Sequence, residues 1–226
     1  MKKIIYILLI LNAALSHAAP TGSFTVKAGT ENGPKKLVCY VPEDYSDEKS
    51  RPLIIALQPG GNTAAESMFE MMFPAAFFCE AILICPDDQP QYDGKTIQPA
   101  IDYAFENYNI DPDNIVITGY SAGGNHTFIY AMNNPDKIRG IIGIAPSIKA
   151  DLDYEKFKST AVCFIVGMDD ALSAGAAKHA AALKALNYRL KLILKPGVGH
   201  YSSDYFYGDD FTIDWIECWE FIRGGE

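Results

Sequence analysis

The sequence predicts a single α/β domain in which helices cover both faces of a mostly parallel central sheet. Apolar runs of strand length alternate along the chain with segments of helical periodicity, which is the pattern of parallel strands joined by crossover helices. Most of these runs are continuously apolar, as expected for strands that are buried on both faces. The length of 226 residues suits one domain, and 49% hydrophobic with 21% charged residues is a globular composition.

Each predicted strand is a short apolar run bounded by turn-forming residues. The first two strands are joined by a turn around Asn32-Gly33, and the third is bounded by Pro52 and Pro59. The later runs have strand length and resemble the third. In chain order, the predicted strands cover residues 23–28, 36–41, 53–57, 81–85, 114–118, 138–145, 161–167 and 189–194.

Between the strands lie segments with helical spacing or helix-forming composition. Pro74 is expected to bend or divide the first helix, and the fourth helix is rich in alanine. The last helix carries an apolar stripe that we expect to face the core, formed by Phe211, Trp215, Trp219 and Ile222. The predicted helices cover residues 63–79, 96–107, 122–133, 174–187 and 209–222.

Residues 1–18 are expected to be a signal peptide. Two lysines precede an apolar run over residues 4–15, and small residues stand just before a cleavage site after Ala18. The run is shorter than the about 20 residues that span a bilayer. We therefore expect residues 19–226 to form the domain of a secreted or periplasmic protein with no membrane segment after cleavage. An uncleaved anchor is the alternative.

The net charge and the spacing of the cysteines argue against nucleic acid and metal ions as ligands. The formal net charge is −9 and no basic cluster offsets it, so nucleic acid is not expected to bind. The five cysteines lack CxxC or histidine-rich spacing, so we predict no metal site and no cofactor. Cys79 and Cys85 are the nearest pair, should export allow one disulfide. The oligomeric state stays open.

The segment from Gly119 to Gly123 contains the pattern G-x-S-x-G, centred on Ser121. The pattern alone is weak evidence, because a glycine-rich turn between a strand and a helix also explains it. Its context is more specific: it follows a predicted strand and opens a predicted helix, the setting of a nucleophile elbow. A serine there lies near a helix N-terminus, where developing negative charge is favoured. Ser121 is therefore the candidate nucleophile.

A serine nucleophile needs a histidine base and an acid that orients it. Of the histidines after Ser121, His126 lies in the helix of the nucleophile and should point away from it, and His179 is expected at the surface of a helix. His200 follows a strand in a glycine-rich loop, so it is the candidate base. The acid should follow an intervening strand, and either Asp169 or Asp170 fits that place.

An oxyanion hole needs two backbone N–H groups aimed at the developing charge. Ala122, the residue after the nucleophile, would supply one of them. The other should come from the loop after an early strand. Pro59 has no N–H, so the donor there should be Gly60 or Gly61.

These motifs resemble those of the polyhydroxybutyrate depolymerase and feruloyl-esterase-like hydrolases, and residues 110–124 are also similar to bacterial carboxylesterases. Residues 57–64 resemble the family segment L-H-G-x-G-x-T-A, and residues 110–124 resemble its elbow. The family motif G-x-x-D matches Gly167 to Asp170, which favours Asp170 over Asp169 as the acid. The resemblance implies an α/β-hydrolase fold, with no large lid.

The chain departs from the family pattern in two places. The family's His-Gly before the oxyanion loop is Gln58-Pro59 here, and its V-P after the acid is Leu172-Ser173. The first change alters the support of the oxyanion loop.

From these residues we expect a secreted serine ester hydrolase that forms an acyl-enzyme intermediate on small or polysaccharide-linked esters, including acyl or feruloyl esters. A serine peptidase of the same fold and a non-catalytic binding protein derived from a hydrolase are the alternatives. Several residues that follow strand ends could line the pocket or have ordinary structural roles: Asp87, Asp88, Tyr201, Tyr205, Phe206 and Tyr207.

Overall fold

The computed structural model describes residues 19–29, 33–61, 64–88, 94–149, 151–203 and 208–224. The predicted signal peptide lies outside the described residues, and so do Asn32, Asn62, Thr63 and the pocket candidates Tyr205, Phe206 and Tyr207.

The described residues form one eight-stranded sheet with strand order β1-β2-β4-β3-β5-β6-β7-β8. The first two strands pair antiparallel, β2 pairs antiparallel with β4, and every other pair is parallel. The sheet is therefore mostly parallel, as predicted. The strands are β1 (Gly22–Ala28), β2 (Lys35–Val41), β3 (Arg51–Leu57), β4 (Ile82–Pro86), β5 (Ile110–Tyr120), β6 (Gly140–Ile144), β7 (Ala161–Gly167) and β8 (Leu190–Lys195).

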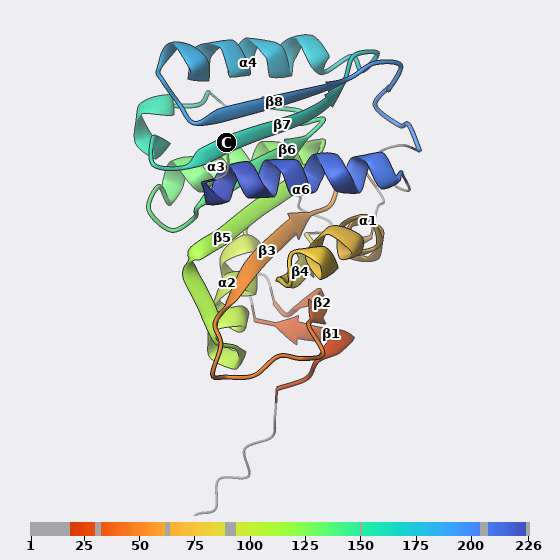
Figure 1. The fold of residues 1–226 in the computed structure, drawn as a ribbon, viewed down its shortest axis with the longest axis vertical. Coiled ribbons are helices and arrows are strands. Elements are labelled where there is room, and N and C mark those ends of the chain that lie inside the picture. Colours follow the sequence, from red (N-terminus) through yellow and green to blue (C-terminus); the bar gives the residue numbers. More distant parts are fainter. Residues whose placement is uncertain are drawn as a thin grey trace, which may run out of the picture.

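Helices cover both faces of this sheet (Figure 1). One face packs against α1 (Ala65–Phe78) and α6 (Asp209–Arg223), which lie in front of the sheet in the figure. The other face packs against α2 (Ile97–Asn107), α3 (Ala122–Asn133) and α4 (Ser173–Ala185).

Strand β3 shows why its sequence is continuously apolar. Leu53 and Ile55 contribute to the core on the side of α2 and α3, whereas Ile54 and Ala56 contribute to the core under α1 and α6. Successive side chains of a strand point to opposite faces, so a strand covered on both sides must be apolar at every position.

The predicted apolar stripe of the last helix is confirmed as a core face. Trp215 and Trp219 are fully buried in α6, and their rings stack with centroids 5.8 Å apart. Phe211 and Ile222 are buried on the same face. A Cβ added at Gly140 of β6 would lie 2.7 Å from the Ile222 side chain, so the helix sits directly on the strand.

Several element boundaries differ from the prediction. Strand β5 begins at Ile110 rather than at residue 114, because Ile110 pairs with Arg51 of β3 before a register irregularity. Pro74 does not divide α1, which runs through it. A 3-10 helix, η1 (Tyr154–Phe157), was not predicted; the Asp153 side chain caps it by accepting a hydrogen bond from the Glu155 N–H at 3.2 Å.

The five cysteines are free thiols, so the suggested Cys79–Cys85 disulfide is absent. Cys85 lies in the interior of β4, and Cys79 follows the end of α1. Burial raises the pKa of the Cys79 thiol to about 12. In the described segments, no insertion large enough to form a lid interrupts the elements, and no helix there is long and apolar enough to cross a membrane.

Candidate active site

Ser121 lies at a sharp turn between β5 and α3. Its backbone has φ 54° and ψ −112°, in a region that side-chain-bearing residues rarely adopt. The turn is held in place by its neighbours: the Ser121 N–H donates to the Ile144 carbonyl at 2.9 Å, and the Ser121 carbonyl accepts from the Ser147 N–H at 2.9 Å. Strain of this kind persists only where surrounding contacts enforce it, and it is common at functional sites.

The glycines around Ser121 are required by close packing. A Cβ at Gly119 would lie 2.4 Å from the Gly123 backbone, and a Cβ at Gly123 would lie 2.4 Å from the Leu57 carbonyl oxygen. At Gly124 it would lie 2.7 Å from Pro146. Each distance is far below van der Waals contact, so the elbow can approach β3 and β6 only with glycine at these positions.

His200 lies between Ser121 and Asp170. Its Nε2 is 3.0 Å from Ser121 Oγ, and its Nδ1 is 2.8 Å from Asp170 Oδ2. The Asp170 side chain is completely buried, and its other oxygen accepts a hydrogen bond from the Leu172 N–H at 2.7 Å. Because a carboxylate only accepts, the proton of a neutral imidazole is held on Nδ1, and the Nε2 lone pair then faces the serine hydroxyl.

The structure separates the two adjacent aspartates. Asp169 is exposed, and its backbone N–H donates to the Val198 carbonyl at 3.1 Å. Asp170 is 3% exposed and is the one in contact with His200. The structure brings Asp170, and not Asp169, to His200.

The loop after β3 reaches the elbow where an oxyanion hole would form. A Cβ at Gly60 would lie 3.3 Å from the Ala122 Cβ, so the two predicted donors are neighbours. Gly61 has φ +90°, which favours glycine.

Gln58, which stands where the hydrolases it resembles have histidine, is buried at the base of this loop. Its Nε2 lies 3.5 Å from Asp87 Oδ1, a long hydrogen bond. Asp87 in turn lies 3.8 Å from Lys36 Nζ, and Lys36 pairs with Glu66 at 2.8 Å. The loop is thus linked to the end of β4, to β2 and to the first turn of α1.

Comparison with known proteins gives one family match and one curated relative. The model of the prolyl oligopeptidase family (Peptidase_S9) matches residues 87–159, which include the elbow. An acetylxylan esterase from Coprinopsis cinerea is 28% identical over 137 residues. That match covers 52% of this chain but only 37% of the esterase, so the chain spans little more than a third of the length of this curated relative.

Solved structures align over most of the chain. A hyperthermophilic esterase from the archaeon Pyrobaculum calidifontis has a TM-score of 0.72 at 16% identity, covering 91% of this chain and 86% of its own. The chain has the α/β-hydrolase fold. The feruloyl esterase module from Clostridium thermocellum, solved with sinapinate, shares this fold with a TM-score of 0.68 at 14% identity, over 85% of this chain and 88% of its own.

His126 and His179, the other histidines after Ser121, lie elsewhere in the α/β-hydrolase fold. His126 packs against Gly94, whose added Cβ would lie 3.1 Å from the histidine Cβ. His179, which is expected at the surface of a helix, is partly exposed and partly buried in α4, and its Nδ1 shares a hydrogen bond with the Tyr154 hydroxyl. Burial lowers the pKa of the His179 imidazole, and nearby Lys178 lowers it further.

Two pocket candidates have structural partners. Asp88 is buried and accepts hydrogen bonds from the Gly94 N–H at 2.8 Å and the Thr96 hydroxyl at 3.0 Å, so it anchors the chain before α2. Tyr201 is 88% exposed, and its ring lies edge-on to the His200 ring with centroids 4.8 Å apart. Of these two, only Tyr201 adjoins the site.

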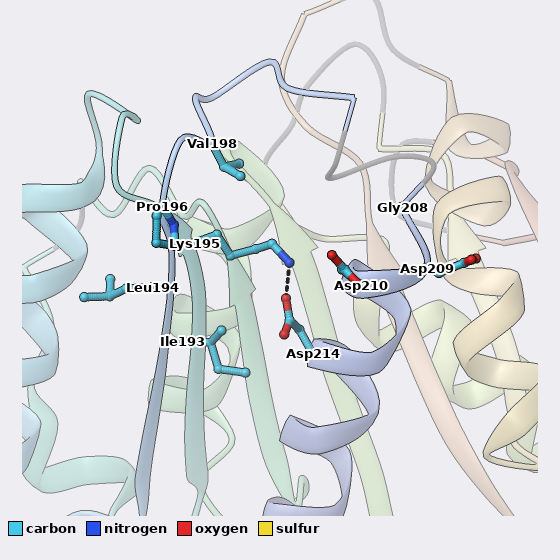
Figure 2. A pocket seen from close by; sticks show the side chains of 9 residues that line it. All are labelled: Ile193, Leu194, Lys195, Pro196, Val198, Gly208, Asp209, Asp210 and Asp214. Atoms are coloured by element: carbon cyan, nitrogen blue, oxygen red, sulfur yellow. Dashed lines mark hydrogen bonds and ion pairs between the residues drawn. The ribbon is translucent and has the colours of Figure 1, made fainter.

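A pocket of about 540 Å³ lies between the end of β8 and the start of α6 (Figure 2). Lys195 points across it to form an ion pair with Asp214, and Asp209 and Asp210 stand at its rim in the first turn of α6. Ser121, Asp170 and His200 do not line it. In the described parts of the chain, no group of three or more His, Cys, Asp or Glu side chains could hold a metal ion.

Proposed function

We propose that this chain is a secreted serine ester hydrolase of the carboxylesterase type, with Ser121 as nucleophile, His200 as general base and Asp170 as the orienting acid. The observation that carries the proposal is the continuous chain of contacts from Ser121 Oγ through both ring nitrogens of His200 to Asp170. This order of groups is what activates a serine hydroxyl.

The proposed reaction has two halves. His200 Nε2 takes the Ser121 proton as Oγ attacks the ester carbonyl, and the backbone N–H groups of Ala122 and Gly60 stabilise the oxyanion. The intermediate collapses as His200 returns the proton to the leaving alcohol, which leaves an acyl group on Ser121. Water, deprotonated by His200, then attacks the acyl carbonyl; the bond to Ser121 Oγ breaks as His200 returns the proton to Oγ, and the carboxylic acid departs. Asp170 stays ionised throughout and stabilises the imidazolium.

The proposed substrates are acyl or feruloyl esters carried on polysaccharides. The support is the resemblance of residues 57–64 and 110–124 to the polyhydroxybutyrate depolymerase and feruloyl-esterase-like hydrolases, together with the similarity to an acetylxylan esterase and a feruloyl esterase module. A signal peptide at residues 1–18 fits an enzyme that meets such polymers outside the cytoplasm. Export predicts that the mature protein begins at Ala19, which N-terminal sequencing of the exported protein would check.

A serine peptidase is the second candidate function. The match of residues 87–159 to the prolyl oligopeptidase family favours it, because that family is named for peptide cleavage. The same three residues would serve either reaction, so the distinction depends on the leaving group. An amide leaves only after its nitrogen is protonated, which demands more of the general acid than an ester does.

A matched panel of substrates tests the proposal. We expect hydrolysis of acetylated xylo-oligosaccharides or feruloyl esters, with no cleavage of peptide anilides and loss of all activity in Ser121→Ala. Hydroxyalkanoate oligomers in the same panel test the polyester branch of the resemblance. Faster cleavage of the anilides would favour the peptidase. An inert wild-type protein that also fails to react with a fluorophosphonate would leave only the non-catalytic alternative.

A further inference from the structure

Tyr120 is next to Ser121 in the chain and contacts His200 in space. It is the last residue of β5, directly before Ser121, and is 2% exposed. Its hydroxyl donates a hydrogen bond to the backbone carbonyl of His200, and its ring lies 5.3 Å from the His200 ring, with 32° between the two planes. One side chain therefore contacts both the main chain and the ring of the proposed base.

The loop that carries His200 has conformational freedom that must be limited. It contains Gly197, with φ +72°, and Gly199. Backbone bonds hold its beginning: Met168 donates to Lys195 at 2.9 Å, and Asp169 donates to Val198 at 3.1 Å. The Tyr120 hydroxyl acts further along, at His200 itself. Glycine loses more backbone entropy on ordering than other residues, so this loop needs a fixed contact to hold His200 in one position.

We propose that Tyr120 is a positioning residue that sets the separation between His200 Nε2 and Ser121 Oγ. Asp170 holds the imidazole from Nδ1 and fixes its tautomer, whereas Tyr120 holds the backbone from which the ring projects. Because Tyr120 is covalently adjacent to Ser121, a shift of the elbow carries the base with it. This role rests on the proposed function, since it matters only if His200 takes the Ser121 proton.

The test is Tyr120→Phe, which keeps the ring and removes the hydroxyl. Tyr108→Phe is the matched control: Tyr108 is also buried, and its hydroxyl donates to a backbone carbonyl, that of Pro20, at 2.9 Å. A displacement of about 1 Å at reacting groups can cost up to about 100-fold. We expect kcat to fall by about 10- to 100-fold in Tyr120→Phe with KM unchanged. Tyr108→Phe should keep wild-type kcat and KM.

Two further measurements distinguish positioning from a general loss of structure. In a double-mutant cycle with Asp170→Asn, the combined loss should be smaller than the product of the single losses, because both changes act through His200. Hydrogen exchange of the peptide spanning residues 196–203 should be faster in Tyr120→Phe and unchanged in Tyr108→Phe. Wild-type kcat in Tyr120→Phe, or equal losses in both phenylalanine variants, would overturn the role.

The exchange measurement is informative whether or not the protein hydrolyses esters. If the wild-type protein is inactive and exchange is still faster in Tyr120→Phe, the result counts against the ester hydrolase and not against the contact between Tyr120 and His200. Unchanged exchange and unchanged kcat in an active enzyme would count against Tyr120 alone.

Discussion

Asp170 Oδ2 lies 2.8 Å from His200 Nδ1, although 30 positions separate the two residues along the chain. Strands β7 and β8 bring them together, because they are adjacent and parallel, with Gly167 paired to Lys195 at their carboxyl ends. Ser121 follows β5 at the same edge of the sheet. Parallel strands direct the loops after their ends to one side, where ligands bind in open α/β sheets.

Exchange of either aspartate for its amide should separate their roles. Asp170→Asn retains the shape of the side chain but favours the wrong histidine tautomer, a change that costs about 10⁴ in kcat in serine proteases. We expect a loss of that order from Asp170→Asn. The control is Asp169→Asn, which should lose less than about tenfold because its side chain lies outside the contact with His200. Steady-state kinetics on an aryl ester measure both, and equal effects would contradict the assignment.

A fluorophosphonate probe should label the protein at Ser121. Labelling needs a serine that is activated by a base, so it reports the Ser121–His200 contact directly. Peptide mapping should place the adduct on the Gly119–Gly124 segment, and Ser121→Ala should show none. An adduct on another serine would remove Ser121 from the proposed role.

The strained turn at Ser121 predicts an order of stability among inactive variants. Both Ser121→Ala and Ser121→Gly remove the hydroxyl, but only glycine adopts φ 54° without steric cost. We expect Ser121→Gly to be the more stable by about 1 kcal/mol, the lower end of the strain stored at such residues. Urea denaturation compares the two, and a more stable alanine variant would show that the strain at Ser121 is smaller than the extra entropy that glycine loses on folding.

A methyl group at Gly60 should disturb the proposed oxyanion hole. It would lie 3.3 Å from the Ala122 Cβ and press the two donors apart. Loss of one donor costs about 10²–10³ in kcat, so a displaced donor should cost about 10- to 100-fold in Gly60→Ala. Gly175→Ala is the control: it places a methyl group in open space on α4 and should leave kcat unchanged while it stabilises the protein by about 0.5–1 kcal/mol.

The partly buried position of His179 predicts a stability change in mildly acidic solution. Its pKa is lowered from 6.5 in the folded protein, so the unfolded chain binds the proton more readily. The stability that neutral His179 contributes is therefore fully present above about pH 6.5 and is lost as the pH falls below that value. The melting temperature of the wild type should fall more steeply below that pH than that of His179→Gln. If the melting temperatures of the two proteins change in parallel with pH, His179 does not cause the loss of stability.

The sequence predicts the parts of this fold that follow from local pattern. Continuously apolar runs marked the strands of the parallel sheet, and helical spacing marked the buried face of α6. The chain order of Ser121 and His200 and their places after strands were enough to select them as candidates that the structure brings together. Asp170 needed the G-x-x-D resemblance, because adjacent residues after a strand look equivalent until their directions are known.

Other features depend on packing that local pattern does not contain. The early start of β5 comes from the pairing of Ile110 with Arg51, a contact between distant segments. His179 shares a hydrogen bond with Tyr154, which lies 25 positions away. The contact of Tyr120 with His200 likewise joins residues 80 positions apart, and in the sequence Tyr120 is only one of the two variable positions of G-x-S-x-G.

The stacked tryptophans of α6 provide an intrinsic fluorescence signal that reports on this helix. The chain has two tryptophans, both in this helix, and Trp215 Nε1 donates to Thr118 Oγ1 at 3.2 Å, three residues before Ser121. Emission excited selectively at the indole rings therefore reports whether α6 is docked beneath β5, while far-ultraviolet dichroism reports the whole sheet. If the two signals diverge during denaturation, the last helix leaves before the rest of the domain unfolds, and loss of activity should follow the emission signal.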